Sequence, residues 1–235
     1  MKNGSIITIE NLVKSFPIGG GEFTALNGIN LNFEKGEFSG IVGPSGSGKT
    51  TLLNILGSLD TPSKGQTNVL GTSSGQMTPK VSATLRKKHI GFIFQTYNLM
   101  PVYTVFENVE FPLLLLKMPA ADRKNAVLEA LEWVGLTDKV KSKPPQLSGG
   151  ESQRVAIARA MVKKPDLVLA DEPTANLDAE NSHHILQTME NLNKELQTTF
   201  VFATHDEKVI GYLRRIIRLE DGKVVSDAYI KKQEP

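Results

Sequence analysis

The chain has 235 residues, of which 40% are hydrophobic and 22% charged, and its formal net charge is +2. This length and composition suit one large α/β domain, and so small a charge argues against nucleic acid or an anionic lipid surface as a partner. The absence of cysteine excludes disulfides, thiolate chemistry and cysteine-ligated metals. The sequence has neither a signal-peptide core nor an apolar run long enough to span a membrane, so we expect a cytoplasmic protein.

The first forty residues alternate between short apolar pieces and turns. Strands are predicted at 6–12, 23–25, 29–33 and 38–42, separated by the glycine triplet 19–21 and by a turn at 34–37. The pattern indicates a small antiparallel sheet that leads into the next motif.

That motif is Gly43-Pro44-Ser45-Gly46-Ser47-Gly48-Lys49-Thr50, which fits G-x-x-x-x-G-K-[ST]. A strand precedes it and a helix is predicted from Lys49 to about Leu59, so an ordinary glycine turn is the weaker alternative. The glycines let backbone N–H groups surround a phosphate chain, and the helix start adds partial positive charge. Lys49 would reach the β- and γ-phosphates and the Thr50 hydroxyl would hold Mg²⁺. The sequence therefore predicts a nucleoside triphosphate site.

The middle of the chain changes character at Thr96. Before it, strands are predicted at 66–70 and 90–94 around a helix at 81–88; after it, prolines interrupt the sequence and a helix with one apolar face is predicted at 122–134. We interpret residues 96–147 as a helical subdomain inserted into a nucleotide-binding core made of residues 1–95 and 148–235.

The remainder alternates strand and helix. Helices are predicted at 150–162 and 181–196, buried strands at 167–170 and 200–203, and a hairpin at 216–225. This alternation predicts a mostly parallel sheet with ligands at the carboxyl ends of its strands.

Two of these strand ends carry ionisable groups. Asp171 and Glu172 directly follow the strand at 167–170, and His205 follows the next one. Beside a phosphate loop, the first carboxylate can hold Mg²⁺ and the second can activate water as a general base. His205 could hold the γ-phosphate and orient that water. The alternatives are a helix-capping acidic pair and a structural histidine.

Leu147-Ser148-Gly149-Gly150-Glu151 opens the helix at 150–162. Ser148 and Glu151 have the spacing of a capping box. A capped helix start that begins with glycines is also an anion site, and here it would be the second such site in one domain.

Several motifs occur together in one order along the chain. They are the Walker A motif at 43–50, Gln95, the Leu-Ser-Gly-Gly signature at 147–150, the strand and acidic pair at 167–172, Ala175-Asn176-Leu177-Asp178 and His205. In this respect the whole chain resembles an ABC-type ATPase domain. The resemblance implies a P-loop NTPase core with an N-terminal antiparallel β subdomain and an inserted helical subdomain. It also implies a head-to-tail homodimer that encloses two ATP molecules, each between one copy's phosphate loop and the other's signature helix.

The resemblance also implies roles for individual residues. Nucleotide binding would involve Phe16 against adenine, the phosphate-loop residues Gly43, Pro44, Ser45, Gly46, Ser47, Gly48, Lys49, Thr50 and Thr51, and, from the other copy, Ser148, Gly149, Gly150 and Asp178. Thr50, Gln95 and Asp171 would hold Mg²⁺. Glu172 would be the general base, assisted by His205, Gln95 and Lys49, and Asp178 would couple the two ATP sites.

Two positions depart from the commonest family pattern. Glu151 stands where glutamine is usual, and Asn176 stands where alanine is common. We expect the Glu151 carboxylate to point back to the backbone of its own Ser148, as a capping box requires, and not toward the partner's phosphate.

The segment 91–113 resembles the ATPases of lipoprotein release and macrolide export, which move separate integral membrane permease subunits. Its apolar residues Leu99, Met100, Val102, Val105 and Phe106 suit a groove for a short helix, or alternatively the insertion's own core. The competing function is a non-transport ABC ATPase that acts on DNA or ribosomes. Such proteins carry a long coiled coil or two heads, whereas about a hundred residues without sustained heptads separate Walker A from the signature here. We therefore expect a transport ATPase at the inner face of the membrane, with no nucleic-acid partner.

Overall fold

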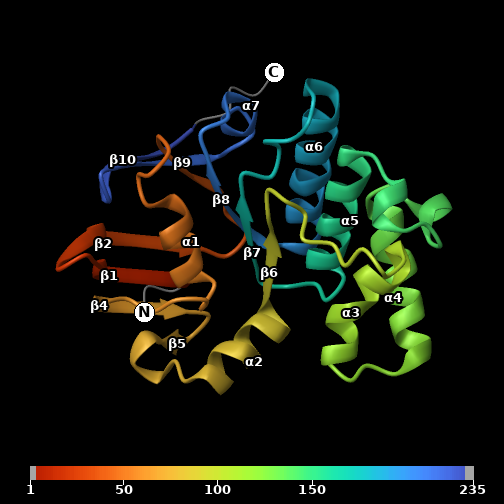
Figure 1. The fold of residues 1–235 in the computed structure, drawn as a ribbon, viewed down its shortest axis with the longest axis horizontal. Helices are drawn as coiled ribbons and strands as arrows, with labels where there is room; N and C mark the ends of the chain where they lie inside the picture. Colours follow the sequence, from red (N-terminus) through yellow and green to blue (C-terminus); the bar gives the residue numbers. More distant parts are fainter. Residues whose placement is uncertain (1–3, 231–235) are drawn as a thin grey trace.

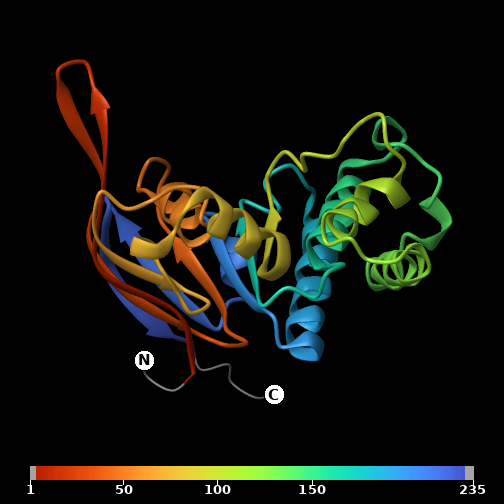
Figure 2. The same ribbon diagram turned by 90° about the horizontal axis from the view of Figure 1, so that it is seen from below.

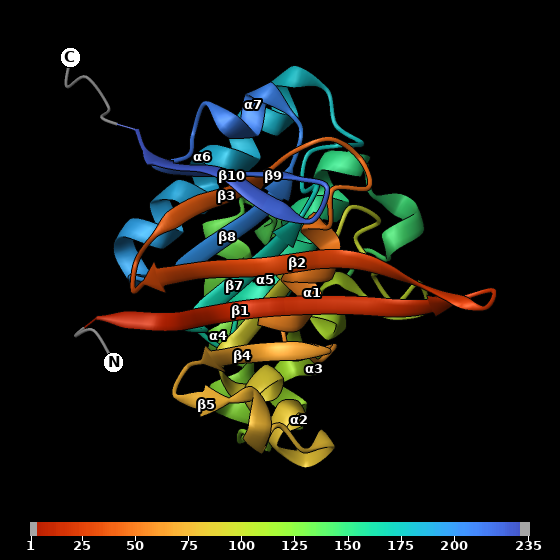
Figure 3. The same ribbon diagram turned by 90° about the vertical axis from the view of Figure 1, so that its left-hand side faces the viewer.

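The structure is a computed structural model that describes residues 4–230. An antiparallel sheet of four strands forms one layer (Figures 1 and 3). Its strand order is β2 (Gly21–Glu34), β1 (Ser5–Ile18), β4 (Lys64–Val69) and β5 (Thr72–Ser73). This is the predicted antiparallel subdomain, but β1 and β2 are each 14 residues long and form a single extended hairpin.

The second sheet has six strands and is mostly parallel. Its order is β10 (Lys223–Tyr229), β9 (Arg215–Glu220), β3 (Phe38–Val42), β8 (Thr199–Thr204), β7 (Leu167–Asp171) and β6 (Ile90–Ile93). The pairs from β9 to β6 are parallel, and only β10 runs antiparallel to β9. Every residue of β3 and β8 is buried, as expected for parallel strands covered on both faces. The predicted α/β fold is confirmed.

Each face of the six-stranded sheet has its own hydrophobic core. On one face, α1 (Lys49–Leu56) lies between the two sheets and buries Leu52, Leu53 and Leu56. On the other face, α5 (Gly149–Met161) and α6 (Ala179–Leu196) cover the sheet (Figure 2). The central strands are therefore held from both sides, which fixes the positions of the loops at their carboxyl ends.

The remaining helices extend this arrangement. They are α2 (Pro79–His89), α3 (Val105–Leu115), α4 (Ala120–Trp133), α7 (Glu207–Ile210) and the 3₁₀ turns Ser74–Gln76, Thr137–Lys139 and Pro144–Gln146. Helices α3 and α4 pack against α5 at one end of the molecule (Figures 1 and 2). Among residues 4–230, none of the helices combines the length and the apolar character that a bilayer-crossing segment requires.

The structure differs from the sequence-based expectation in three places. Strand β1 appears fragmented in sequence because its pairing with β2 shifts register between Ile9 and Leu12, which interrupts the alternation of buried residues. Helix α1 ends at Leu56, before the expected Leu59, because Gly57 caps it and Ser58 is left-handed. Helix α3 was not predicted, although Thr104 and Glu107 form a capping box at its start.

Candidate functional site

The strand order brings the motifs of distant sequence segments to one edge of the six-stranded sheet. Strand β8 lies between β3 and β7, and β6 pairs with the other side of β7. The phosphate loop follows β3, His205 follows β8, Glu172 follows β7 and Gln95 lies just after β6. Parallel strands end at the same edge, so these groups are neighbours as the sequence predicted.

The phosphate loop has the backbone of an anion cradle. The Lys49 ammonium donates to the carbonyl oxygens of Gly43 and Pro44, at 2.7 and 2.9 Å, which fixes the loop carbonyls on the side of that ammonium. Gly48 has φ +101°, and a Cβ at Gly43 would come within 2.1 Å of the Leu219 carbonyl oxygen. Only glycine fits at either position. The loop leads into the N-terminus of α1, whose first N–H groups have no partner within the helix.

Oxygen ligands for a divalent cation lie beside this loop. The Thr50 hydroxyl donates to the Asp171 carboxylate, with Oγ1 to Oδ2 at 3.0 Å. Burial raises the pKa of Asp171 above its ordinary value, an effect that the Thr50 hydrogen bond opposes and the neighbouring Glu172 charge adds to. A nearby cation would stabilise the charged form of the Asp171 carboxylate. Hydroxyl and carboxylate oxygens are ligands that Mg²⁺ prefers, so the residues present fit this ion.

Glu172 is held in one orientation by the next strand. Its two carboxylate oxygens contact the Thr204 hydroxyl at 2.9 Å and Nδ1 of His205 at 2.6 Å. The Glu172 side chain is 14% exposed and that of His205 67%. The backbone of Glu172 is left-handed, with φ 45°, which costs about 1 kcal/mol or more for a residue with a Cβ. The carboxylate thus points into the site from a strained strand end.

These groups surround a cavity of about 430 Å³. Its lining residues are Phe23, Ala25, Ser45, Gly46, Gly48, Lys49, Thr50, Thr51, Gln95, Asp171, Glu172 and His205. Of the other predicted phosphate-loop residues, Gly43 and Pro44 line a smaller adjoining hollow with His205, and Ser47 is buried.

Phe23 is a site residue that the sequence-based reasoning missed. It lines the cavity, whereas Phe16, the residue expected to stack on adenine, is its cross-strand partner on the β1–β2 hairpin. Directly opposed residues of an antiparallel pair project from the same face, so both rings lie on one side of the hairpin. Lys14 covers Phe16, with its ammonium 4.9 Å from the ring centroid. The two phenylalanines lie at equal distances from Gly19-Gly20, where the hairpin turns, and this spacing was the available signal.

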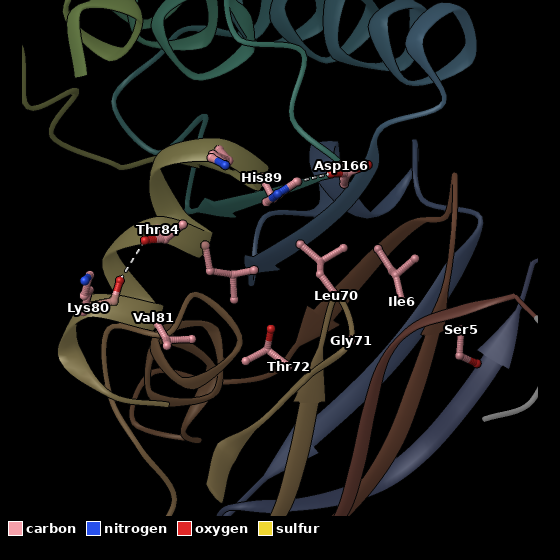
Figure 4. A pocket seen from close by; sticks show the side chains of 12 residues that line it. Ser5, Ile6, Leu70, Gly71, Thr72, Lys80, Val81, Thr84, His89 and Asp166 are labelled. Atoms are coloured by element: carbon pink, nitrogen blue, oxygen red, sulfur yellow. Dashed lines mark hydrogen bonds and ion pairs between the residues drawn. The ribbon is translucent and has the colours of Figure 1, made fainter. Parts of the chain in front are cut away.

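Another cavity lies elsewhere and has different chemistry. Its volume is about 670 Å³, and it lies between α2 and the antiparallel sheet (Figure 4). His89 and Asp166, which form an ion pair at 2.7 Å across its edge, precede β6 and β7. The cavity is therefore at the amino ends of the strands, opposite the phosphate loop.

The signature segment forms the predicted capping box. The Ser148 N–H donates to a Glu151 carboxylate oxygen at 2.8 Å, and the Glu151 N–H donates to the Ser148 hydroxyl at 3.2 Å. Lys139 contacts the other carboxylate oxygen at 3.1 Å. These bonds lower the pKa of Glu151, and the prediction that it points to its own Ser148 is confirmed. Ser148, Gly149, Gly150 and Asp178 are not part of the cavity lining in the same chain.

An open groove separates the core from the helical segment. It has a volume of about 570 Å³, and its walls include Phe94, Met100, Phe111 and Leu115 together with the basic residues Arg86, Lys87, Arg159 and Lys163. Of the apolar residues expected to form a groove, only Met100 lines it. Val105 belongs to the hydrophobic core, and Leu99 and Phe106 pack against that core, so the alternative reading holds for these three. Val102 is exposed and does not line the groove.

Comparison of the sequence with known proteins finds relatives that are ATP-binding proteins of transporters. Residues 26–175 match the family model described as ABC transporter. The lipoprotein-releasing system ATP-binding protein LolD of Pseudoalteromonas translucida is 46% identical over 222 residues, covering 94% of this chain and 96% of that protein. The macrolide export ATP-binding/permease protein MacB of Burkholderia pseudomallei is 41% identical over 224 residues, which are 95% of this chain but 34% of that protein.

Solved structures have the same fold. A dimeric, post-hydrolysis state of the ATP-binding cassette MJ0796 bound to ADP and phosphate superposes with a TM-score of 0.89. It is 40% identical in sequence, and the match covers 96% of this chain and 99% of that one. A cassette from Clostridium perfringens, part of the cbiONQ ABC transporter complex, superposes with a TM-score of 0.87 at 30% identity, covering 97% of this chain and 89% of that one.

Proposed function

Because this chain belongs to the ABC transporter family and is an ATP-hydrolysing transport subunit, we propose that two copies close head to tail around two ATP molecules. The movement would drive separate integral membrane subunits of the lipoprotein-release or macrolide-export type. The observation that carries the proposal is the separation of the site into two parts. The cavity contains the phosphate loop, Asp171, Glu172 and His205, whereas Ser148 and Gly150 are not part of it.

ATP binding would use the phosphate loop and the hairpin above it. The backbone N–H groups of residues 43–50 and the Lys49 ammonium would surround the β- and γ-phosphates, with Thr51 following on α1. The adenine base would lie against Phe16, and Phe23 on the cavity wall would add a second apolar surface.

Thr50, Asp171 and Gln95 would hold Mg²⁺, and this ion, when bound, supplies positive charge that offsets the charge developing on the phosphates. Asp171 would contribute as a carboxylate, supported by its contact with the Thr50 hydroxyl. Gln95 lies on the cavity wall just after β6, and its side-chain oxygen would contact the ion and the attacking water.

Glu172 would accept the proton of the attacking water while His205 holds the γ-phosphate. The Glu172 carboxylate is fixed by Thr204 and His205, so little orientation has to be established when ATP binds. The water oxygen attacks phosphorus, the bond to the β–γ bridging oxygen breaks, and ADP and phosphate are the products.

The second copy would complete the site. Its Ser148 hydroxyl accepts from the Glu151 N–H, which leaves the hydroxyl hydrogen free to donate to a γ-phosphate oxygen of the first copy. The N–H groups of Gly149 and Gly150, at the positive N-terminal end of α5, would donate to the same phosphate. Asp178, which caps α6, would couple the two sites.

The membrane subunit would dock in the groove between the core and the helical segment. Its lining includes aromatic and aliphatic side chains together with four basic residues. These surfaces suit a short amphipathic helix that carries acidic groups. The protein would then be cytoplasmic and attached to the membrane through its partner.

A single substitution tests the two-copy mechanism. Glu172→Gln should retain ATP binding, lose hydrolysis by about 100-fold or more, and accumulate as an ATP-bound dimer in size-exclusion chromatography. Lys49→Ala, which removes the phosphate contact, should lose ATP affinity and remain monomeric under the same conditions. Near-normal hydrolysis by Glu172→Gln, or a monomer at saturating ATP, would contradict the proposal.

A further inference from the structure

A side-chain hydrogen bond joins the loop that carries Gln95 to the loop that carries Asp178. Nδ2 of Asn176 donates to the Gln95 carbonyl oxygen at 3.0 Å. Alanine at this position would have no side-chain donor. We propose that Asn176 is a positioning residue that latches the two loops together, so that movement of the Gln95 loop is passed directly to the loop preceding α6.

The Gln95 loop depends on contacts of this kind because its backbone is strained. Tyr97 and Asn98 both adopt left-handed conformations, with φ 60° and 50°. Two consecutive residues with side chains rarely occupy this region unless the surrounding structure holds them there. The Arg159 guanidinium donates to the carbonyl oxygens of Tyr97 and Asn98 from one side, and Asn176 holds Gln95 from the other.

The loop at the other end of the latch is tied to α6 and to the signature helix. Asp178 accepts from the N–H and the side-chain amide of Asn181, at 2.8 and 2.7 Å. Asn181 in turn packs so closely on Gly150 that a Cβ there would lie 2.4 Å from its Oδ1. Gly150 belongs to the start of α5, which is proposed to meet the second copy. A displacement of Asn176 would therefore occur close to that surface.

The groove proposed to bind the membrane subunit is lined in part by residues of the Gln95 loop and by residues that hold it. Asn98 and Arg159 both line the groove, so a helix seated there touches the residues that hold the Gln95 loop in its strained form. The resulting route runs from the groove through the loop after β6 to Asn176 and on to Asp178. This route rests on the proposed function for its occupant, but the latch itself is a property of the single chain.

Hydrogen–deuterium exchange on the isolated, nucleotide-free protein tests the latch directly. Asn176→Ala and Asn176→Asp should each speed amide exchange in the segment 95–98 by about fivefold, the scale of one neutral hydrogen bond. The aspartate keeps the size of the side chain but cannot donate to a carbonyl oxygen. Glu180→Gln, an exposed change on the first turn of α6, is the matched control and should leave exchange unchanged. Unchanged exchange in either Asn176 variant overturns the proposal.

Steady-state ATP hydrolysis supplies a second readout, which separates positioning from direct nucleotide contact. Asn176→Ala should lower kcat by about threefold at unchanged KM, because the phosphate loop is untouched while the loops lose their fixed spacing. A raised KM at unchanged kcat would assign Asn176 to the partner's nucleotide and overturn the latch. Failure to find a membrane partner would contradict the proposed function but leave the exchange result intact, so the two failures are distinguishable.

Discussion

At the scale of single residues, the two residues that depart from the common family pattern, Glu151 and Asn176, both contact groups of their own chain. Glu151 accepts from Ser148 and Lys139, and Asn176 donates to Gln95. In both cases a polar side chain is directed to a group of its own chain. The charge that Glu151 introduces at the signature helix is therefore balanced by a lysine within the same subunit.

This balance predicts a small effect of neutralising Glu151. In the Glu172→Gln background, Glu151→Gln should change the ATP concentration needed for dimerisation by less than about tenfold, or roughly 1.4 kcal/mol. Glutamine can form the same capping box, and the lost charge faces Lys139 and not the partner. ATP titrations followed by size-exclusion chromatography measure the change. Dimerisation more than tenfold tighter would mean that the carboxylate faces the partner's phosphate.

The site residues that lie at the carboxyl ends of the strands were largely predictable from the sequence. The Walker A motif, Asp171, Glu172 and His205 each follow a buried apolar run, and parallel strands bring such positions to one edge. Phe23 was not predictable by the same reasoning, because its position depends on the register of a hairpin with several shifts. The Asn176 contact was equally hidden, since it joins two loops 81 positions apart in sequence.

At the scale of elements, long periodic segments were predicted and irregular ones were not. Helix α6 and strands β7 and β8 match their apolar patterns closely. Helix α3 was missed because Pro112 lies inside it and its exposed face carries Phe111, Leu114 and Leu115. The polar face that would make the buried apolar stripe visible in the sequence is therefore absent. Two of these exposed residues, Phe111 and Leu115, line the groove in the structure.

The end of helix α2 provides a prediction on pH. The Lys163 ammonium donates to the carbonyl oxygens of Arg86, Lys87 and Ile90, and burial lowers its pKa from 10.5 to about 8. Between these two values the unfolded chain binds more protons than the folded one, so this group makes the free energy of unfolding rise with pH. Lys163→Met should remove that rise, as measured by urea unfolding across the window. The exposed Lys164→Met is the control, and equal pH slopes for Lys163→Met and wild type would contradict the prediction.

At the scale of the whole molecule, the nucleotide cavity and the groove both reach the segment that follows β6. The nucleotide cavity contains Gln95, and the groove contains Asn98 and Arg159. Only a few residues separate them along the chain. Under the proposed function, binding of a membrane helix and closure on ATP would therefore act on one short segment, which suits a protein that converts hydrolysis into movement.

The groove assignment predicts different outcomes for two substitutions on one helix. Phe111→Asp should weaken binding of the membrane subunit by about tenfold or more, because it places a charge on the apolar wall that a helix would bury. Leu114→Asp, equally exposed on α3 but outside the groove lining, should have little effect. Pull-down of a co-expressed membrane subunit of the lipoprotein-release or macrolide-export type measures both. Equal loss in the two variants would place the contact elsewhere.

The left-handed backbone of Glu172 has a consequence for the evolution and engineering of this protein. A residue without a Cβ would relax the backbone there, but it would also lose the side-chain contacts with Thr204 and His205. Replacing Glu172 with glycine would therefore change backbone strain and side-chain hydrogen bonding in opposite directions, so the free energy of unfolding would change little while the proposed general base is lost. Directed evolution for a more robust protein should therefore screen for hydrolysis at every round, because a screen for stability alone would not remove variants that have lost the proposed base.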